Sequence, residues 1–323
     1  MSDMTFAKNK NLVIPLMGVN GIHMSEANLK EHLFNAEIQF DTLKKMVDKF
    51  KPDGIFAFMD LTVEAEAAGM KIKYEENENP SVIEHTIKNL DDLENLKKNY
   101  VHMSGRMNVF VDVIKKMSEN LSVIKGAHVI GPFTLAGELL GVSELTMNTI
   151  LDPDIVHACL EFTVELISEY INKLFEAGAD VISVLEPTAM MISPAQFAEF
   201  SVAPFKKILK NVDNKPLILH ICGDTKHLIE KMGQSGAVAL SIDWQVDMKD
   251  AIKKIPSDVY LIGNLDPVAV FLDMNEAQIK EATLKLKNDM NEYDNFIISS
   301  GCDLPIKTPD ENIIAFIDAA KNR

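Results

Sequence analysis

The chain alternates short apolar runs with longer amphipathic stretches, and this alternation restricts its fold more than any other feature. Short apolar runs between turn residues are typical of buried strands, whereas an apolar period near 3.6 is typical of helices. The expected strands are residues 12–17, 54–59, 123–130, 181–185, 216–221, 237–242, 259–262 and 296–299. Helical patterns lie between them, among them residues 155–176, 195–211 and 275–291.

Eight strands that alternate with helices predict an α/β protein with a (β/α)8 TIM barrel. The alternative is an open doubly wound sheet, but no glycine-rich phosphate loop follows the first strand. We therefore expect residues 1–323 to form a single barrel domain. It has an N-terminal extension and an elaborated segment around residues 64–120.

Composition excludes several classes of protein. A hydrophobic content of 47% and a charged content of 25% are those of a soluble globular protein. The formal net charge of −16 argues against a nucleic-acid partner, because phosphates would be repelled. No apolar run is long enough for a membrane span, and the polar start carries no secretion signal. Three cysteines suggest no disulfide framework, so we expect a reducing cytoplasm.

The barrel prediction also locates the chemistry, because the active sites of such barrels lie at the C-terminal ends of the strands. Nearly every expected strand is followed there by a group that can bind metal, donate a hydrogen bond or move a proton. The candidates are Asn20, Asp60, Glu186, His220, Cys222, Asp243, Asn264 and Cys302.

His220, Cys222 and Cys302 stand out among these groups, because one imidazole and two thiolates are good ligands for zinc. Residues i and i+2 of an extended segment face the same way, so His220 and Cys222 can share a metal. Three protein ligands leave one tetrahedral position open, which is typical of a catalytic site. Such a zinc can bind a substrate thiol and remove its proton. The alternative is three unrelated residues, since free cysteine is often a small buried hydrophobe.

The remaining candidates are less specific. Glu186 is predicted to be catalytic, either as a fourth metal ligand that substrate displaces or as a base that takes the thiol proton; the alternative is a solvated loop carboxylate. Asn20, Asp60, Asp243 and Asn264 are predicted to bind substrate, although the aspartates can equally cap the next helix. Glu64 and Glu66 lie in the first turn of an expected helix, where acidic residues favour the helix dipole.

Four stretches now point to a known family: residues 60–69, 131–138, 219–225 and 300–305, together with the turn at 263–267. On these motifs the chain resembles the uroporphyrinogen decarboxylase-like superfamily. Within it, the chain is similar to the zinc-dependent corrinoid methyltransferases of the methylcobamide:coenzyme M type. The similarity spans nearly the whole chain. Its most specific part is the His-x-Cys-Gly segment with the distant Gly-Cys.

The resemblance implies a barrel with zinc at its mouth, held by His220, Cys222 and Cys302. It implies methyl transfer between a methylcobamide, carried on a separate corrinoid protein, and a small thiol such as coenzyme M. The decarboxylases of the superfamily use no metal, and their arginine-rich N-terminal signature is absent. Residues 15–21 occupy that region here.

Several alternatives stay open at this point. The acceptor can be a pterin such as tetrahydrofolate, or the transfer can run from a methyl donor to the corrinoid. A metal-free decarboxylase and a non-catalytic corrinoid- or metal-binding accessory protein are further alternatives, although the Asp-x-His-x-x-Gly signature of corrinoid-binding modules is absent. Arg106 and Arg323 are the only arginines, and both are expected to be peripheral. A sulfonate acceptor therefore has no obvious arginine partner.

Overall fold

A computed structural model describes residues 12–322. Its strands are β1 (Gly54–Phe56), β2 (Ile72–Lys73), β3 (Ser81–Val82), β4 (Ile124–Ile130), β5 (Val181–Leu185), β6 (Leu217–Ile221), β7 (Ala239–Ile242), β8 (Tyr260–Leu265) and β9 (Phe296–Ser300). Its α-helices are α1 (Leu29–Phe34), α2 (Ala36–Phe50), α3 (Val63–Ala67), α4 (Leu90–Asn99), α5 (Met107–Asn120), α6 (Pro132–Leu140), α7 (Val142–Leu151), α8 (Pro153–Glu176), α9 (Pro194–Phe197), α10 (Ala203–Asn211), α11 (Ile229–Gly233), α12 (Met248–Ile252), α13 (Glu276–Asp289) and α14 (Asp310–Lys321). Two 3-10 helices, η2 (Val19–Met24) and η3 (Pro187–Met191), and the π-helix η4 (Ala198–Val202) complete the elements.

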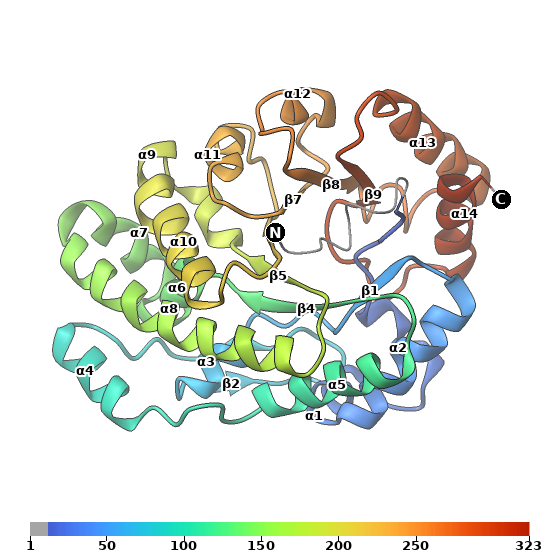
Figure 1. Ribbon diagram of the computed structural model, residues 1–323. Helices are drawn as coiled ribbons and strands as arrows, with labels where there is room; N and C mark the ends of the chain where they lie inside the picture. The colour runs from blue at the N-terminus through green and yellow to red at the C-terminus, as the bar shows by residue number, and fades with distance from the viewer. Residues whose placement is uncertain (1–11, 323) are drawn as a thin grey trace.

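Seven parallel strands form one curved sheet in the order β1-β4-β5-β6-β7-β8-β9, surrounded by helices (Figure 1). The segment that begins at Leu12 closes the ring between the two edge strands. Val13 pairs in parallel with Ile298 of β9, and on its other side Asp53 N–H donates to the Val13 carbonyl at 3.0 Å. The predicted (β/α)8 barrel is therefore confirmed, and an open sheet is excluded because both edges are joined.

The closing segment is less regular than the predicted strand 12–17, because Pro15 has no N–H to donate to a ladder. Two serine hydroxyls of β9 supply the missing bonds. Ser299 Oγ donates to the Ile14 carbonyl at 2.6 Å, and Leu16 N–H donates to Ser300 Oγ at 3.0 Å. Side chains therefore hold the eighth position of the barrel next to the strand that leads to Cys302.

The barrel interior has an apolar floor and a polar layer above it. Each of the eight strand positions contributes to a separate buried apolar cluster, which consists of Leu12, Ile14, Phe56, Ile124, Val181, Ile218, Ala239, Ile262 and Ile297. Because alternate residues of a strand share one face, the next inward positions follow two residues later. On five strands these positions hold Ser183, His220, Ser241, Asn264 and Ser299, all buried. The polar side chains of the site therefore lie directly above a buried apolar layer.

Two regions differ from regular barrel units. Between α3 and α5 the chain forms the antiparallel pair β2–β3 and helix α4, which lie along one side of the barrel (Figure 1). The predicted helix 195–211 is divided into α9, the π-helix η4 and α10. Pro204 explains this break, because its ring provides no N–H for the carbonyl one turn earlier.

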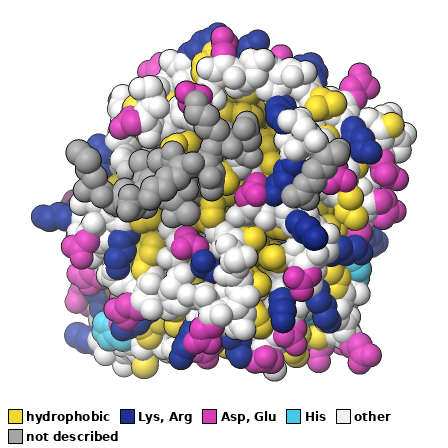
Figure 2. All heavy atoms as spheres, turned by 45° about the vertical axis from the view of Figure 1, so that its right-hand side comes forward, with side chains coloured by type: hydrophobic (Ala, Val, Ile, Leu, Met, Phe, Trp, Pro, Cys, Tyr) yellow, Lys and Arg dark blue, Asp and Glu magenta, His cyan; other side chains and the backbone are white. Residues whose placement is uncertain are grey.

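Acidic and basic side chains are interspersed over the face drawn in Figure 2. Within residues 12–322 we find no helix with the length and apolar character that a bilayer crossing requires.

Candidate metal centre at the mouth of the barrel

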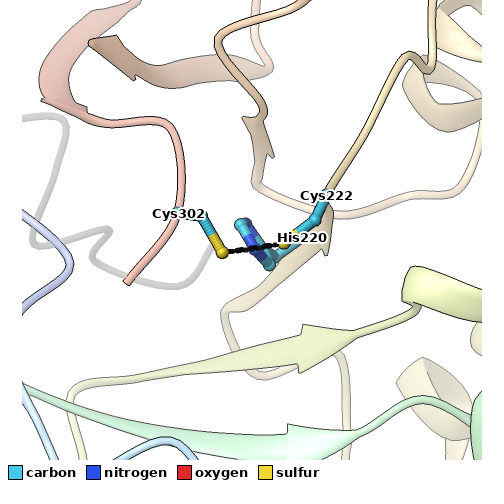
Figure 3. Close-up of side chains that lie close together, drawn as sticks. All are labelled: His220, Cys222 and Cys302. Carbon is cyan, nitrogen blue, oxygen red and sulfur yellow. Dashed lines mark hydrogen bonds between the residues drawn. The ribbon is translucent and has the colours of Figure 1, made fainter. Parts of the chain in front are cut away.

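His220, Cys222 and Cys302 converge at the C-terminal ends of two strands that are not adjacent in the ring (Figure 3). His220 lies on β6, Cys222 follows β6 directly, and Cys302 follows β9. His220 Nε2 is 3.0 Å from Cys222 Sγ and 3.9 Å from Cys302 Sγ, and the two sulfurs are 2.9 Å apart. Within residues 12–322, these three form the one group of His, Cys, Asp or Glu whose ligand atoms all lie within 4.8 Å of one another.

The histidine is buried, whereas both cysteines are only partly buried, so the group opens toward the barrel mouth. The hydrogen bond between the two sulfurs lowers the pKa of Cys302 below its usual value, and His220 acts in the same direction. The same hydrogen bond, together with burial, raises the pKa of Cys222. One proton is therefore shared between the sulfurs, and a cation bound there would displace it.

A hydrogen bond from outside the three candidate ligands orients the imidazole of His220. His220 Nδ1 is 2.9 Å from Ser241 Oγ on the neighbouring strand β7, which leaves Nε2 directed at the sulfurs. Metal-binding histidines commonly use their other ring nitrogen in this way, which fixes the ring orientation. The residue set, with one nitrogen and two sulfurs and no further protein ligand, therefore fits a tetrahedral zinc with one open position.

We expect Ser241→Ala to weaken zinc binding by about 10- to 100-fold while the barrel stays folded, because such outer contacts typically have effects of this size. Competition with a chromophoric chelator measures the affinity. Ser183→Ala is the matched control, since Ser183 is an equally buried serine on β5. Equal affinities for both variants would contradict the orienting role.

Close backbone contacts fix the loops that carry the cysteines. Gly223 N–H donates to Asp243 Oδ2 at 2.9 Å, and Gly223 has a φ of +92°, which few other residues adopt. On the other side, a Cβ at Gly301 would lie 2.6 Å from the Trp244 nitrogen. Asp243 and Trp244 thus lie between the two loops. Asp243 is one of the residues predicted to bind substrate. Its carboxylate oxygens accept hydrogen bonds from Gly223 N–H and Gln245 N–H, so Asp243 positions Gly223.

Glu186 is completely buried, so the interpretation of a solvated loop carboxylate is wrong. Its oxygens accept hydrogen bonds from Phe133 N–H, Thr134 N–H and the Thr134 hydroxyl at 2.7–3.0 Å. These donors lie in the first turn of α6, where a helix favours negative charge. Burial nevertheless raises the pKa of Glu186 to about 7. Glu186 is outside the group of three metal ligands, and its predicted role as a base stays a prediction.

Asp60 lies in a buried ion cluster with Arg106, and the expectation that Arg106 is peripheral is wrong. The Arg106 side chain is 2% exposed and donates to Asp60, to Glu66 Oε2 at 2.8 Å and to the Thr62 hydroxyl at 2.9 Å. Its guanidinium also lies over the rings of Phe34 and Tyr74. The buried Asp60 carboxylate requires this cation, because an unpaired charge is costly to remove from water, and the partly buried Glu66 shares it. Arg323 lies outside the described residues.

Glu64, expected to act on the helix dipole, is instead almost fully buried. Its Oε1 accepts from Ile130 N–H at 2.9 Å, whereas its Oε2 has no partner among the described residues. Burial raises the pKa of Glu64 to about 8. The side chain is therefore mostly protonated at neutral pH.

A raised pKa makes stability depend on pH, because the folded state retains a proton that the unfolded chain releases. The contribution of Glu64 is fully present below its unfolded pKa near 4.5 and is lost as pH rises toward about 8. We expect the free energy of unfolding of Glu64→Gln to change less across this range than that of the native protein. Urea titrations between pH 5 and pH 8 measure it, with Glu26→Gln at an exposed site as control. Parallel pH profiles would contradict the assignment.

The two predicted asparagines are both buried. Asn264 Nδ2 donates to the Asp243 and Val246 carbonyls at 2.9 and 2.7 Å, so it supports the loop after β7. Asn20 accepts from Gly18 N–H through Oδ1, and its Nδ2 has no partner among residues 12–322. Asn20 thus has donor capacity left for a ligand, and substrate binding by both residues stays a prediction.

Sequence reasoning missed Ser241 and Arg106. Ser241 was detectable from the sequence. It lies two residues before Asp243, and residues i and i+2 of an extended segment point to the same face. Arg106 carried no such signal, because its partners Asp60 and Glu66 lie 46 and 40 residues earlier.

Comparison with known proteins decides the family. The model of the family described as uroporphyrinogen decarboxylase (URO-D) matches residues 14–323. The chain belongs to this family. Among members of the uroporphyrinogen decarboxylase family, the methylcobamide:CoM methyltransferase MtbA of Methanosarcina mazei is 34% identical over 81% of this chain and 78% of its own length. A uroporphyrinogen decarboxylase of Prochlorococcus marinus is 29% identical over 91% of this chain and 86% of its own.

A solved methyltransferase from Methanosarcina mazei has the same fold as this family member, with a TM-score of 0.89 and 25% identity. It covers 99% of this chain and 97% of its own. A B12-independent methionine synthase from Shewanella matches with a TM-score of 0.66 at 13% identity, which shows the fold alone. These comparisons confirm the resemblance read from the motifs and place the chain with the methyltransferases, as an enzyme.

Proposed function

We propose that this protein is a zinc-dependent methyltransferase that moves a methyl group from a methylated corrinoid, carried by a partner protein, to a thiol. The observation that carries the proposal is the convergence of His220, Cys222 and Cys302 within 4.8 Å at the barrel mouth. The relatives named for methyl transfer from a methylcobamide to CoM support both the donor class and a thiol acceptor.

His220, Cys222 and Cys302 would hold the zinc, which would supply Lewis-acid activation of an incoming thiol. The chain supplies the geometry. Ser241 fixes the imidazole of His220, and Asp243 holds the loop of Cys222. As thiolates, Cys222 and Cys302 would offset the two positive charges of the metal, so a substrate thiolate would keep its negative charge and its nucleophilicity. Both cysteines must stay reduced, so the proposal includes a reducing compartment such as the cytoplasm.

The reaction balances as an in-line displacement. The sulfur forms a bond to the methyl carbon while the carbon–cobalt bond breaks, and the electron pair stays on cobalt, which becomes cobalt(I). The thiol proton leaves to solvent or to a base. Glu186 is the candidate base because burial raises its pKa to about 7, so that it can take up a proton near neutral pH. Its hydrogen bonds to the first turn of α6 argue that Glu186 also positions this helix.

Decarboxylation is the second candidate function, because relatives named uroporphyrinogen decarboxylase match 91% of the chain. Two observations disfavour it. The family resemblance ties decarboxylation to an arginine-rich N-terminal segment, which this chain lacks. Its one described arginine, Arg106, has its guanidinium occupied by Asp60, Glu66 and Thr62. Substrate carboxylates would therefore find no free guanidinium among residues 12–322.

The test is to load the purified protein with zinc, measure its metal content and follow the absorbance of methylcobalamin. We expect about one zinc per chain and loss of the methylcobalamin spectrum when a thiol is present. Removing zinc with a chelator should abolish turnover, and adding zinc back should restore it. Tetrahydrofolate in place of the thiol tests the pterin alternative. Protein that binds no zinc under ample supply would refute the proposal.

A further inference from the structure

His128 is a histidine inside the barrel that does not belong to the candidate metal centre. It lies on β4, four residues after Ile124 of the apolar floor, and alternate residues of a strand share one face. Its ring stacks on that of Phe56, another member of the floor, with the ring centroids 4.9 Å apart. The imidazole therefore points into the interior of the barrel and not toward the surrounding helices.

Strand pairing places His128 at the level of His220. His128 is in register with Ser183 of β5, and Ser183 is in register with Ile218 of β6. Because the strands of such a barrel are tilted, one level around it climbs by about one residue from each strand to the next. Two strands beyond His128, this level therefore reaches His220, which follows Ile218 by two residues.

The same step continues to Asn264 on β8. His220 is in register with Ser241, Ser241 is in register with Ile262, and Asn264 follows Ile262 by two residues. In barrels of this kind, alternate strands contribute their side chains to one layer. His128, His220 and Asn264 therefore belong to one interior layer, and His128 is the neighbour of a candidate metal ligand.

His128 has unused hydrogen-bonding capacity in this layer. Its Nδ1 is buried without a partner, and we find no hydrogen bond to either ring nitrogen among residues 12–322. By contrast, His220 contacts Ser241 and the sulfurs, and Asn264 Nδ2 donates to two carbonyls. Buried polar groups nearly always have partners. The ring of His128 is only partly buried, so a bound molecule can supply the missing partner.

The chemistry of the imidazole limits what that molecule can be. Burial disfavours the charged form of a histidine, so His128 acts as a neutral ring with one N–H donor and one acceptor nitrogen. Such a ring can hydrogen-bond a hydroxyl or another polar group, whereas it gains nothing from an alkyl chain.

We propose that His128 is a specificity-determining residue, which hydrogen-bonds the polar end of a small thiol whose sulfur lies at the group of His220, Cys222 and Cys302. This inference rests on the proposed methyl transfer and adds a contact for its acceptor. A short thiol carries its polar end close to its sulfur, so a neighbour of His220 in the same layer is well placed to meet it. Because His128 contacts the acceptor and not the metal, replacing it should leave zinc binding intact.

Two thiols of equal length isolate this contact. 2-Mercaptoethanol and 1-propanethiol differ only in a terminal hydroxyl against a terminal methyl group. Rates with zinc-loaded protein and free methylcobalamin are corrected for the thiolate fraction of each thiol. We expect the native protein to have the higher kcat/KM with 2-mercaptoethanol. In His128→Phe this preference should fall by about threefold to tenfold, which is the effect of losing one hydrogen bond.

Two further variants and a binding measurement sharpen the test. His128→Gln keeps a donor and an acceptor, so it should retain part of the preference. His157→Phe is the matched control on the outer face of α8, where His157 is exposed, and it should keep the native preference. All variants should bind native amounts of zinc. Calorimetric titration of the zinc-loaded proteins with both thiols, without corrinoid, should show the same loss of preference in affinity.

An unchanged preference in folded, zinc-loaded His128→Phe would overturn the inference and leave the proposed methyl transfer standing. Loss of zinc from folded His128→Phe would also overturn it, because His128 would then support the metal centre and not the acceptor. Native, zinc-loaded protein that consumes methylcobalamin with neither thiol would instead refute the proposed function itself.

Discussion

Replacing Cys302 by alanine is expected to reduce bound zinc from about one per chain to near zero and methyl transfer to background. In the proposed site, Cys302 is one of the three candidate ligands found among residues 12–322, and two remaining ligands seldom retain the metal. Metal analysis after dialysis, together with the methylcobalamin assay, measures both effects. Cys222→Ala should behave in the same way.

Cys159 provides the control for this change. It is buried in α8, and burial raises the pKa of its thiol to about 12, so it is not expected to bind metal. Cys159→Ala should keep native zinc content and activity. Circular dichroism should show that all three variants are folded, because Cys222 and Cys302 lie in loops at the barrel mouth. Full turnover by a folded, zinc-free Cys302→Ala protein would contradict the role assigned to the metal centre.

The second large effect is expected at Arg106. Arg106→Met should lower the free energy of unfolding by about 3–5 kcal/mol, because it leaves the buried carboxylate of Asp60 and the partly buried carboxylate of Glu66 without a cation. Urea unfolding followed by circular dichroism measures the change.

A combined variant separates lost charge pairing from lost packing. Arg106→Met together with Asp60→Asn and Glu66→Gln removes the cation and both carboxylates, and we expect it to recover a large part of the lost stability. No recovery would show that the rings of Phe34 and Tyr74, which the guanidinium contacts, account for the effect.

The barrel could be predicted from sequence because local patterns and global fold agree. Residues 181–185 were expected as a strand and form β5 with the same limits, since a continuous apolar run lies between a glycine turn and Pro187. The convergence of His220, Cys222 and Cys302 followed from the same logic, because parallel strands end at one mouth. In both cases the necessary information lies within a few residues of each strand end.

What could not be predicted depends on contacts between distant segments. Arg106 lies in an elaborated region whose position against β1 no periodicity reveals, so its burial was unexpected. Glu64 was interpreted from its place in a helix turn, but the tertiary fold packs it against the end of β4. The division of the predicted helix 195–211 arises from Pro204, whose effect on the preceding turn depends on how the helix is held.

The apolar floor beneath the polar layer fills one end of the barrel, so the partly exposed cysteines of the candidate metal centre are reached from the mouth. In the proposed reaction, both reactants and both products must therefore use that entrance. A corrinoid protein that settles over it would cover a small acceptor already inside, and would block one still outside. For the proposed reaction we therefore expect an ordered mechanism, in which the acceptor binds before the corrinoid protein docks and the methylated product leaves after the corrinoid protein has dissociated.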